Sequence, residues 1–431
     1  MALTGRTALL AVLAAPAVGL LAPAWWGPVA VLVVLALGVA ADLTLAGSVR
    51  QLQLTRDGDR SVRLGQQASV QLVVANPGSR RVRGILRDAW PPSAGAERSR
   101  HDVLVPPGER RRLTTVLCPT RRGDRHAHRV TVRSMGPLGL AARQGSHQVA
   151  WTVRALPPFT TRKHLPSKLA RLRELDGRTP VMIRGQGTEF DSLREYVAGD
   201  DVRSIDWRAT ARATDVMVRT WRPERDRQLL LVLDTGRTSA GRVGDAPRLD
   251  HAMDAALLLA ALASRAGDRV DLLAYDRAVR ASVSGVAPTE VLPALVGAMA
   301  TVEPELVEAD VRGMVAIVLS RVSRRSLVVL FTGLDAAAVT EGLLPALPAL
   351  SRRHRVMVVA VADPRAVAMT AGRGDPEAVY AAAAAERATA ERRHTAQLLG
   401  RHGVTVVDAP PEKVAPAVAD AYLALKATGR L

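Results

Sequence analysis

Two apolar runs open the chain, at residues 8–24 and 28–46, and a short segment with two tryptophans, Trp25 and Trp26, separates them. Each run is about long enough to cross a hydrocarbon core of ~30 Å, the first only just. The tryptophans stand where an interfacial aromatic belt would lie. The pattern predicts a hairpin of two transmembrane helices within residues 1–47.

Flanking cations indicate the orientation of this hairpin. Arg6 precedes the first run, and a group of arginines follows the second: Arg50, Arg56, Arg60 and Arg63. By the positive-inside rule, both termini and the soluble domains are expected to be cytoplasmic, on a two-pass protein of the inner or plasma membrane. A cleaved signal peptide is the alternative, because Arg6, the first apolar run and residues 22–24 also fit that pattern.

Residues 48–156 alternate apolar and polar positions over short segments, with Pro, Gly and Asn turn signals between them. Short strands at regular spacing predict a small antiparallel β-sandwich. Three histidines lie in this region, His101, His126 and His128, but their spacing fits no familiar zinc site.

Residues 157–227 begin with a basic connector. Four leucines recur there at helical spacing, with basic residues around them: Leu165, Leu169, Leu172 and Leu175. One interpretation is an amphipathic helix packed between domains. The other is a helix that lies on an anionic membrane surface.

Residues 228–431 alternate apolar strands with helices, which predicts an α/β, Rossmann-like domain with a central parallel sheet covered on both faces. One helix is expected over 304–323. Sites in such sheets form at the carboxyl ends of strands. Three strand ends there carry an aspartate: Asp234, Asp335 and Asp363.

Composition narrows the choice of partners. The formal net charge is +18 and nearly all of the positive charge is arginine, which favours anionic partners such as lipid headgroups, an acidic protein or nucleic acid. An arginine-rich binder of anionic lipid or nucleic acid is therefore one alternative function, with nucleic acid the less expected partner. Aromatic residues make up only 3% of the chain, so a stacking surface for single-stranded nucleic acid is disfavoured. The single cysteine, Cys118, excludes an intrachain disulfide and favours a reducing compartment.

The densest mixture of acids, bases and aromatics runs from Gly185 to Trp221. Helical spacing predicts one helix from Phe190 to Val197. Asp200 or Asp201 is then expected to cap a second short helix. Charges of both signs follow one another along this stretch: Asp191, Arg194, Glu195, Arg203, Asp206, Arg208 and Arg212. Trp207 and Trp221 are placed to cover them.

Two functions fit these charges. The carboxylates of Asp191, Glu195, Asp200 and Asp206 could serve a hydrolase as acid, base or metal ligands. Alternatively the charges form a mutually satisfied network of ion pairs and caps that docks the segment on the α/β domain. The stretch holds no nucleophile–histidine pair and no P-loop lysine, which favours the structural network.

Asp234 ends the first strand of the α/β domain, and hydroxyl groups follow at Thr235 and Thr238. Carboxylate and hydroxyl oxygens are ligands for a hard cation such as Mg²⁺. Asp234 is therefore a second candidate for ligand binding.

The segment from Gly185 to Arg212 resembles the family catalogued as domain of unknown function 58. The resemblance rests on residues that match the usual pattern in order: Gly185, Gly187, Glu189, Phe190, Leu193, Arg194, Glu195, Tyr196, Gly199, Asp200, Arg203, Ile205, Asp206, Trp207 and Arg212. The apolar hairpin, the strand-rich segment with Gly136–Gly139 and the C-terminal α/β pattern extend it over nearly the whole chain.

The resemblance implies that the C-terminal domain is similar to a von Willebrand factor type A domain. In this chain the matching metal-site positions are Asp234, Gly236 and Thr238, while Gly333 stands where a later aspartate is expected and Asp335 lies two residues on. Thr289 is the position assigned to the lone threonine.

The resemblance also implies a bacterial, membrane-anchored partner of a MoxR-type AAA+ ATPase, acting in assembly or maturation of other proteins. Other type A-domain proteins are further expected partners. No activity of its own is implied.

Overall fold

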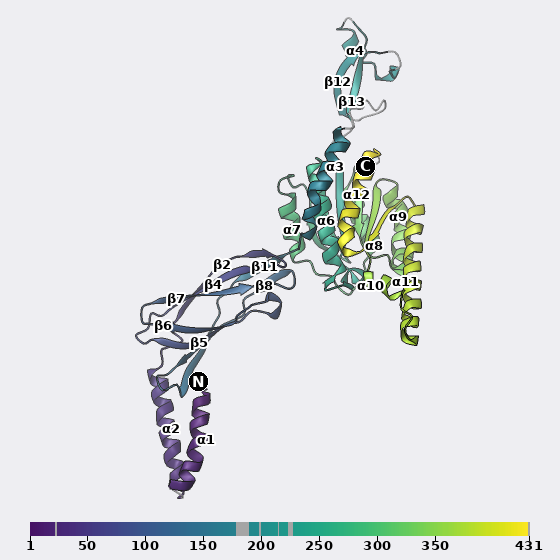
Figure 1. Ribbon diagram of the computed structural model, residues 1–431. Helices are drawn as coiled ribbons and strands as arrows, with labels where there is room; N and C mark the ends of the chain where they lie inside the picture. Colours follow the sequence, from purple (N-terminus) through teal and green to yellow (C-terminus); the bar gives the residue numbers. More distant parts are fainter. Residues whose placement is uncertain (22–23, 178–188, 198–199, 214, 223–226, 430–431) are drawn as a thin grey trace. The chain divides into compact units, whose positions relative to one another are not determined.

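The computed structural model describes residues 1–21, 24–177, 189–197, 200–213, 215–222 and 227–429 (Figure 1). The chain divides into two compact units, Met1–Leu156 and Pro157–Leu431. It is therefore a multidomain protein of sheets and helices.

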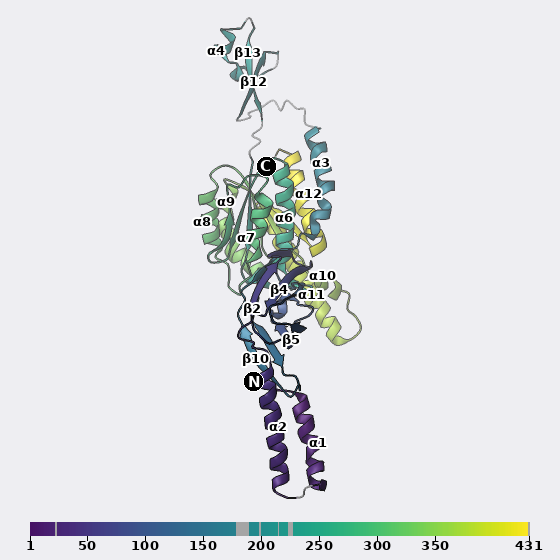
Figure 2. The same ribbon diagram turned by 90° about the vertical axis from the view of Figure 1, so that its left-hand side faces the viewer.

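Two apolar helices, α1 (Gly5–Leu21) and α2 (Trp26–Leu45), begin the first unit and run side by side in both views (Figures 1 and 2). Among the described residues, α2 is the one helix long and apolar enough to cross a membrane, with a mean hydropathy of 2.3. Its large side chains point outward, for example Leu32, which is 69% exposed.

Asp42 fixes the end of α2 to the strand-rich part of this unit. Its carboxylate is fully buried and accepts hydrogen bonds from the backbone N–H groups of Leu138 (2.7 Å), Leu140 (2.5 Å) and Ala141 (3.0 Å). Gly136 is in contact with the same carboxylate, and a Cβ there would collide with it. The turn over residues 136–139 thus binds the Asp42 side chain of α2.

Three small sheets make up the rest of the first unit. The first has the order β1 (Ala2–Leu3), β10 (Ala141–His147), β9 (Val130–Met135), β5 (Val82–Asp88), β6 (Arg100–Val105). The second is β2 (Gln53–Gly58), β4 (Ala68–Ala75), β7 (Arg110–Leu117), and the third is β3 (Ser61–Arg63), β11 (Thr152–Leu156), β8 (Gly123–His126). One short turn of 3-10 helix, η1, spans Pro92–Ala94.

The first two sheets pack their inner faces together. Residues of β4 alternate between buried and half-buried, as the period of two predicts. Leu72 and Val74 from β4 share one apolar core with Leu86 and Val132 from the other sheet. All pairings are antiparallel except one, since β3 and β11 run parallel, which the sequence pattern did not indicate.

The second unit is built on a six-stranded sheet of order β18 (Val279–Val283), β17 (Arg269–Tyr275), β14 (Gln228–Asp234), β19 (Leu327–Phe331), β20 (Arg355–Val361), β21 (Thr405–Ala409). Five strands are parallel and β18 is antiparallel at the edge. The central strands β14, β19 and β20 are apolar runs, because both of their faces are covered.

Helices cover both faces of this sheet. On one face α6 (Arg248–Arg265) packs against α12 (Pro411–Ala427) and α7 (Val291–Ala300). On the other lie α8 (Val311–Arg321), the π-helical turn η4 (Ala338–Leu343), α9 (Leu344–Ser351) and part of α11 (Pro376–Arg401). Short elements complete the unit: α5 (Arg237–Ala240), β15 (Arg242–Val243), β16 (Ala246–Pro247) and α10 (Pro364–Met369).

The helix expected over 304–323 is shorter than the pattern indicates. It begins only at Val311, because the Asp310 side chain accepts a hydrogen bond from the Gly313 N–H and caps it. Residues before it form a loop whose backbone bonds to the ends of β14 and β17, as in the bond from Glu305 N–H to the Thr235 carbonyl.

The basic connector is part of the second unit. It forms η2 (Thr160–His164) and α3 (Leu165–Gly177), which pack on α6 and α12. The Thr161 hydroxyl donates to Asp254 of α6 at 2.8 Å, and Lys168 pairs with Asp420 of α12 at 2.7 Å. Leu172 is buried in this contact. The apolar face is thus covered by protein, and the expectation of a helix on a membrane surface is wrong.

The segment of dense charge contains a β-hairpin. Strands β12 (Glu189–Glu195) and β13 (Met217–Arg222) pair antiparallel, and between them lie η3 (Val202–Ser204) and α4 (Trp207–Thr210). The predicted helix from Phe190 to Val197 is therefore wrong. A segment this short fits both the helical and the strand period, and backbone pairing with β13 decides for the strand.

Candidate functional site

In the hairpin, Asp200 closes a local network. Its carboxylate pairs with the Arg194 guanidinium at 2.6 Å and accepts the Val197 N–H at 3.0 Å. Asp201, as expected, is a cap: it accepts the Arg203 N–H at the start of η3. A second short helix was expected to begin here, but it ends after this single turn.

Both carboxylate oxygens of Asp206 also have partners within the hairpin. One oxygen accepts the N–H groups of Arg208 (2.9 Å) and Ala209 (3.0 Å) at the start of α4, and the other pairs with Arg219 at 2.7 Å. The Arg219 guanidinium, followed by the helix N–H groups, holds the pKa of the Asp206 carboxyl below its ordinary value. This carboxylate is a cap and an ion-pair partner, ionised at neutral pH.

Among the other described residues of this stretch, several are exposed: Glu195, Tyr196, Arg203, Trp207 and Arg212. Trp207 is 68% exposed, so it does not cover the charges as predicted. Gly185, Gly187 and Gly199 lie outside the described residues, as do the side chains of Glu189, Phe190, Asp191 and Trp221.

At the carboxyl end of β14, Asp234 is held by neutral donors. Its Oδ1 accepts the Gly236 N–H at 2.8 Å. Its Oδ2 accepts the hydroxyls of Thr238 (2.8 Å) and Thr332 (2.6 Å). The residue is only 7% exposed. A carboxylate offers about four acceptor positions, so Asp234 keeps capacity for one further donor.

The order of the strands places this carboxylate at a switch point. From β14 the chain crosses through α6 to β17 on one side, and β19 later adds on the other side. Helices that leave neighbouring strands in opposite directions open a crevice at the carboxyl ends. Thr332, which follows β19, reaches Asp234 across this crevice.

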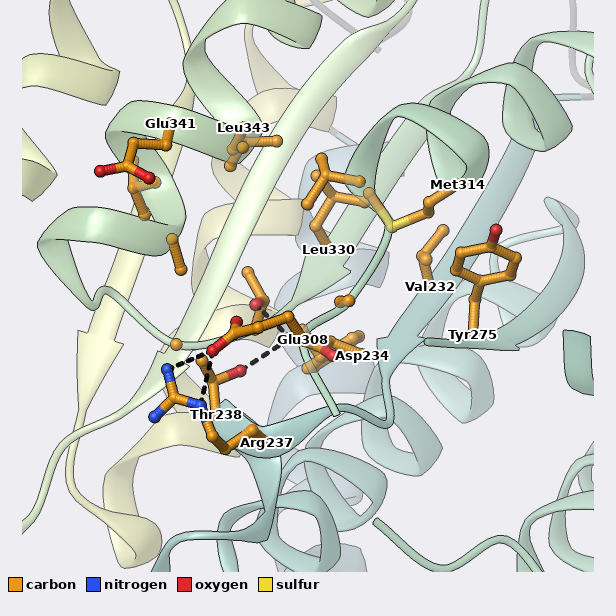
Figure 3. A pocket seen from close by; sticks show the side chains of 18 of the residues that line it. Val232, Asp234, Arg237, Thr238, Tyr275, Glu308, Met314, Leu330, Glu341 and Leu343 are labelled. Carbon is orange, nitrogen blue, oxygen red and sulfur yellow. Dashed lines mark hydrogen bonds and ion pairs between the residues drawn. The ribbon is translucent and has the colours of Figure 1, made fainter. Parts of the chain in front are cut away.

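A pocket of about 450 Å³ occupies the crevice (Figure 3). Its floor is apolar and comes from β14, β19, α8 and η4: Val232, Val311, Met314, Leu330, Val339 and Leu343. Its polar residues are Asp234, Arg237, Thr238, Glu308, Thr332 and Glu341, with Tyr275 at one end. Figure 3 shows Asp234 and Thr238 on the side where Arg237 meets Glu308.

A second buried carboxylate supports the loop beside Asp234. Asp276 is fully buried and accepts the Thr235 hydroxyl at 2.9 Å and Arg280 Nε at 2.6 Å. Burial alone would raise its pKa, but the Arg280 guanidinium and the other donors hold the pKa of Asp276 below its ordinary value. The turn after β14 is thereby fixed from both sides.

Gly333 brings a further carboxylate to this edge. A Cβ on Gly333 would collide with Asp335 Oδ2 and lie 3.1 Å from the Thr238 Cβ. Asp335 is exposed at this point. The missing side chain at Gly333 therefore lets Asp335 lie against the same turn as Thr238.

These residues only partly fit a metal site. Asp234, Thr238 and Asp335 offer oxygen atoms, whereas Gly236 contributes an N–H to Asp234 and no ligand. Within the described ranges, no cluster of three or more His, Cys, Asp or Glu residues could hold an ion. The Mg²⁺ expectation stays a prediction.

Two other sequence assignments fall elsewhere. Thr289 follows Pro288, which lines another cavity with Gln228 and Arg269, the first residues of β14 and β17. Thr289 is therefore at the amino edge of the sheet and is not the partner of Asp234. Thr332 supplies that hydroxyl instead. Asp363 caps α10 by accepting the Arg365 N–H.

With this geometry in view, comparison with known proteins adds one clear result. The family described as "Protein of unknown function DUF58" matches residues 192–396. The DUF58 match covers the hairpin from Ser192 onward and most of the α/β domain, including the whole pocket. It carries no assigned activity.

The relatives of the chain are themselves uncharacterized. An uncharacterized protein of Mycobacterium tuberculosis (strain ATCC 25618 / H37Rv) is 30% identical over 190 residues, which are 43% of this chain and 58% of that protein. The uncharacterized protein YeaD of Bacillus subtilis (strain 168) is 26% identical over 133 residues, 30% of this chain and 33% of YeaD. The chain thus spans less than two thirds of the length of these relatives.

Solved structures are only remotely similar. The CARDB domain of a Pyrococcus furiosus protein, crystallised with di-metal ions, is 18% identical and covers 24% of this chain and 86% of that chain, with a TM-score of 0.18. The Deinococcus radiodurans RO (RSR) protein is 18% identical and covers 49% of this chain and 36% of that chain, with a TM-score of 0.24.

Proposed function

We propose that the chain is a membrane-anchored adaptor whose α/β domain binds a protein partner at the carboxyl edge of its sheet, around Asp234. The observation that carries this proposal is the pocket at the switch point, with a buried carboxylate held only by neutral donors at its mouth. Such a group can take a further donor from a ligand without breaking an ion pair.

Exposed apolar surface supports the anchor. Along α1 and α2, large side chains such as Val12 (68%), Leu32 (69%) and Leu37 (66%) lie open. Water would disfavour so much apolar surface, and a bilayer would cover it. We propose that both helices cross the inner or plasma membrane as a two-pass hairpin with the soluble domains in the cytoplasm.

The partner class follows from the resemblance stated above. In this proposal the α/β domain is of the von Willebrand factor type A kind, and its partner is a MoxR-type AAA+ ATPase that acts in assembly or maturation of other proteins.

The hydrolase alternative has less support. Asp200 and Asp206 are both engaged by arginines and backbone N–H groups, and Glu195 is exposed. A general base needs a free lone pair directed at a substrate. We therefore make no catalytic proposal for the hairpin.

Capture from native membranes tests the adaptor proposal. We expect the intact chain to retain an AAA+ ATPase, identified by mass spectrometry, and the Asp234→Asn variant to lose most of it. Asp363→Asn is the matched control, since it also alters a strand-end aspartate but one that only caps α10. If the intact chain retains no ATPase, the partner proposal is wrong.

Reporter fusions test the topology. A reporter that is active only in the cytoplasm should be active at the C-terminus and at a site after Arg50. Activity only from a reporter that needs export would place the α/β domain outside and would exclude a cytoplasmic ATPase as its partner.

A further inference from the structure

The pocket at the switch point is apolar inside and charged at its mouth. Its apolar residues come from four elements, and Figure 3 shows its charged side chains in two places, with Asp234, Arg237 and Glu308 together and Glu341 apart from them beside Leu343. A metabolite with polar atoms on all sides would leave some of them unpaired against the floor, which costs free energy. The pocket therefore suits an occupant with an apolar end inside and a polar end outside.

The charge of the mouth is opposite to that of the chain. The lining holds three carboxylates, Asp234, Glu308 and Glu341, and one guanidinium, Arg237, which leaves two negative charges. Arg237 and Glu308 pair with each other at 2.7 Å, so the excess lies with Asp234 and Glu341. The chain as a whole carries +18. A basic partner is thus repelled by most of the protein and favoured at this mouth.

The volume and the floor indicate the size of the occupant. Pockets of roughly 300–1,000 Å³ hold a drug-sized group, so about 450 Å³ has room for one or two large apolar side chains. Met314 lines the floor, and its flexible thioether adapts to side chains of different shape. Apolar anchors that fill such pockets contribute most of the affinity at protein interfaces.

We infer that this pocket receives a short amphipathic, basic segment of a partner protein, with leucine-like side chains inserted on the floor and a neighbouring lysine or arginine paired at Asp234 or at Glu341. The inference rests on the proposed function, in that it takes the occupant to be a protein. It adds the sign of the charge and the side-chain class, and it needs no metal.

Peptide binding to the full chain in lipid nanodiscs tests this inference. The probes are capped heptapeptides of glycine and serine that differ only at three central residues: leucine–lysine–leucine, leucine–glutamate–leucine and alanine–lysine–alanine. We expect the first to bind at least about tenfold more tightly than the other two, because only it satisfies both floor and mouth.

Two variants with matched controls locate the binding. Ala338→Phe fills the pocket from its rim, and Glu341→Gln removes one mouth charge. Each should weaken the leucine–lysine–leucine peptide, by about tenfold for the first. Ala384→Phe and Glu377→Gln make the same changes at exposed positions of α11 and should bind as the parent chain does. Thermal melting checks that all four variants are folded.

Several results would overturn the inference. They are equal binding of the glutamate peptide, unchanged binding by Ala338→Phe, no saturation by any peptide, or competition by hexylamine at the peptide's own affinity, which would indicate a small amine as ligand.

Capture from membranes separates the two proposals. If Ala338→Phe still retains the partner, the pocket inference fails and the adaptor proposal stands. If peptides bind but the intact chain retains no partner, the adaptor proposal fails.

Discussion

Two aspartates, Asp206 in the hairpin and Asp234 at the sheet edge, show how differently a carboxylate can be used. Asp206 accepts two helix N–H groups and an arginine, so each of its oxygens is committed and its charge is balanced. Asp234 accepts one N–H and two hydroxyls, so its charge is unbalanced, and it lines a pocket. Asp206 lies in a stretch of dense charge that is visible in the sequence. The surroundings of Asp234 form only because the fold places β14 next to β19.

The largest effect is expected from Asp234→Ala. The change leaves the Gly236 N–H and the hydroxyls of Thr238 and Thr332 without an acceptor in a buried place. Leaving buried donors unpaired should lower the free energy of unfolding of the α/β domain by about 3 kcal/mol. Urea denaturation followed by circular dichroism measures it. An unchanged midpoint would mean that Asp234 does not organise this edge.

Asp42→Asn is a control for Asp234, because it changes another carboxylate that accepts only neutral donors but lies outside the pocket. Asp42 also accepts only neutral donors, three backbone N–H groups, but it lines neither of the two described cavities. The amide replaces one acceptor oxygen with a donor, so the first unit should lose about 2 kcal/mol of stability. Partner capture should persist. Loss of capture with normal melting would show that neutral donors alone do not distinguish Asp234.

Asp206→Ala is expected to have a smaller, local effect. The hairpin should lose the cap of α4 and the pair with Arg219, and the amides of Arg208 and Ala209 should exchange faster with solvent. Hydrogen exchange read by mass spectrometry measures this. The exchange of β14 should not change, and a rise there would tie the hairpin to the core of the sheet.

The smallest effect is a pH dependence within the hairpin. Because Arg219 lowers the folded pKa of Asp206 below its unfolded value of about 4, the carboxylate stabilises the folded hairpin fully above that pH. This contribution is lost as the pH falls through the lower folded pKa. The amide resonances of Arg208 and Ala209 should therefore shift only below pH ~4, and a shift near pH 6 would contradict the ion pair.

Apolar runs and strand-end residues made part of this structure predictable. The short apolar run Gln228–Asp234, followed by helical patterns, predicts a strand buried on both faces, with Asp234 and the hydroxyl of Thr238 at its carboxyl end, and the structure brings the two together. The order of strands is not encoded in any local pattern. Thr332, 98 residues from Asp234, and the pocket between them therefore appeared only with the fold.

The hairpin shows the opposite case. Phe190, Leu193 and Val197 fit a helical period over a segment too short to exclude a strand. Long-range pairing with Met217–Arg222 decided the outcome, and nothing in the local sequence reports it. The cap at Asp201 was easier to predict, since an aspartate before a polar turn often accepts a hydrogen bond from an N–H of that turn. Asp206 caps α4 in the same way, but the sequence pattern indicated it only as one of the charges of this stretch.

Hydrogen exchange of the full chain with and without its captured partner tests the central claim most directly. The account predicts slower exchange in Asp234–Ala240 and in Thr332–Leu343, which line the pocket, and no change in Val202–Val218 of the hairpin. Protection confined to the hairpin, with the pocket segments unchanged, would contradict the assignment of the partner site to the sheet edge.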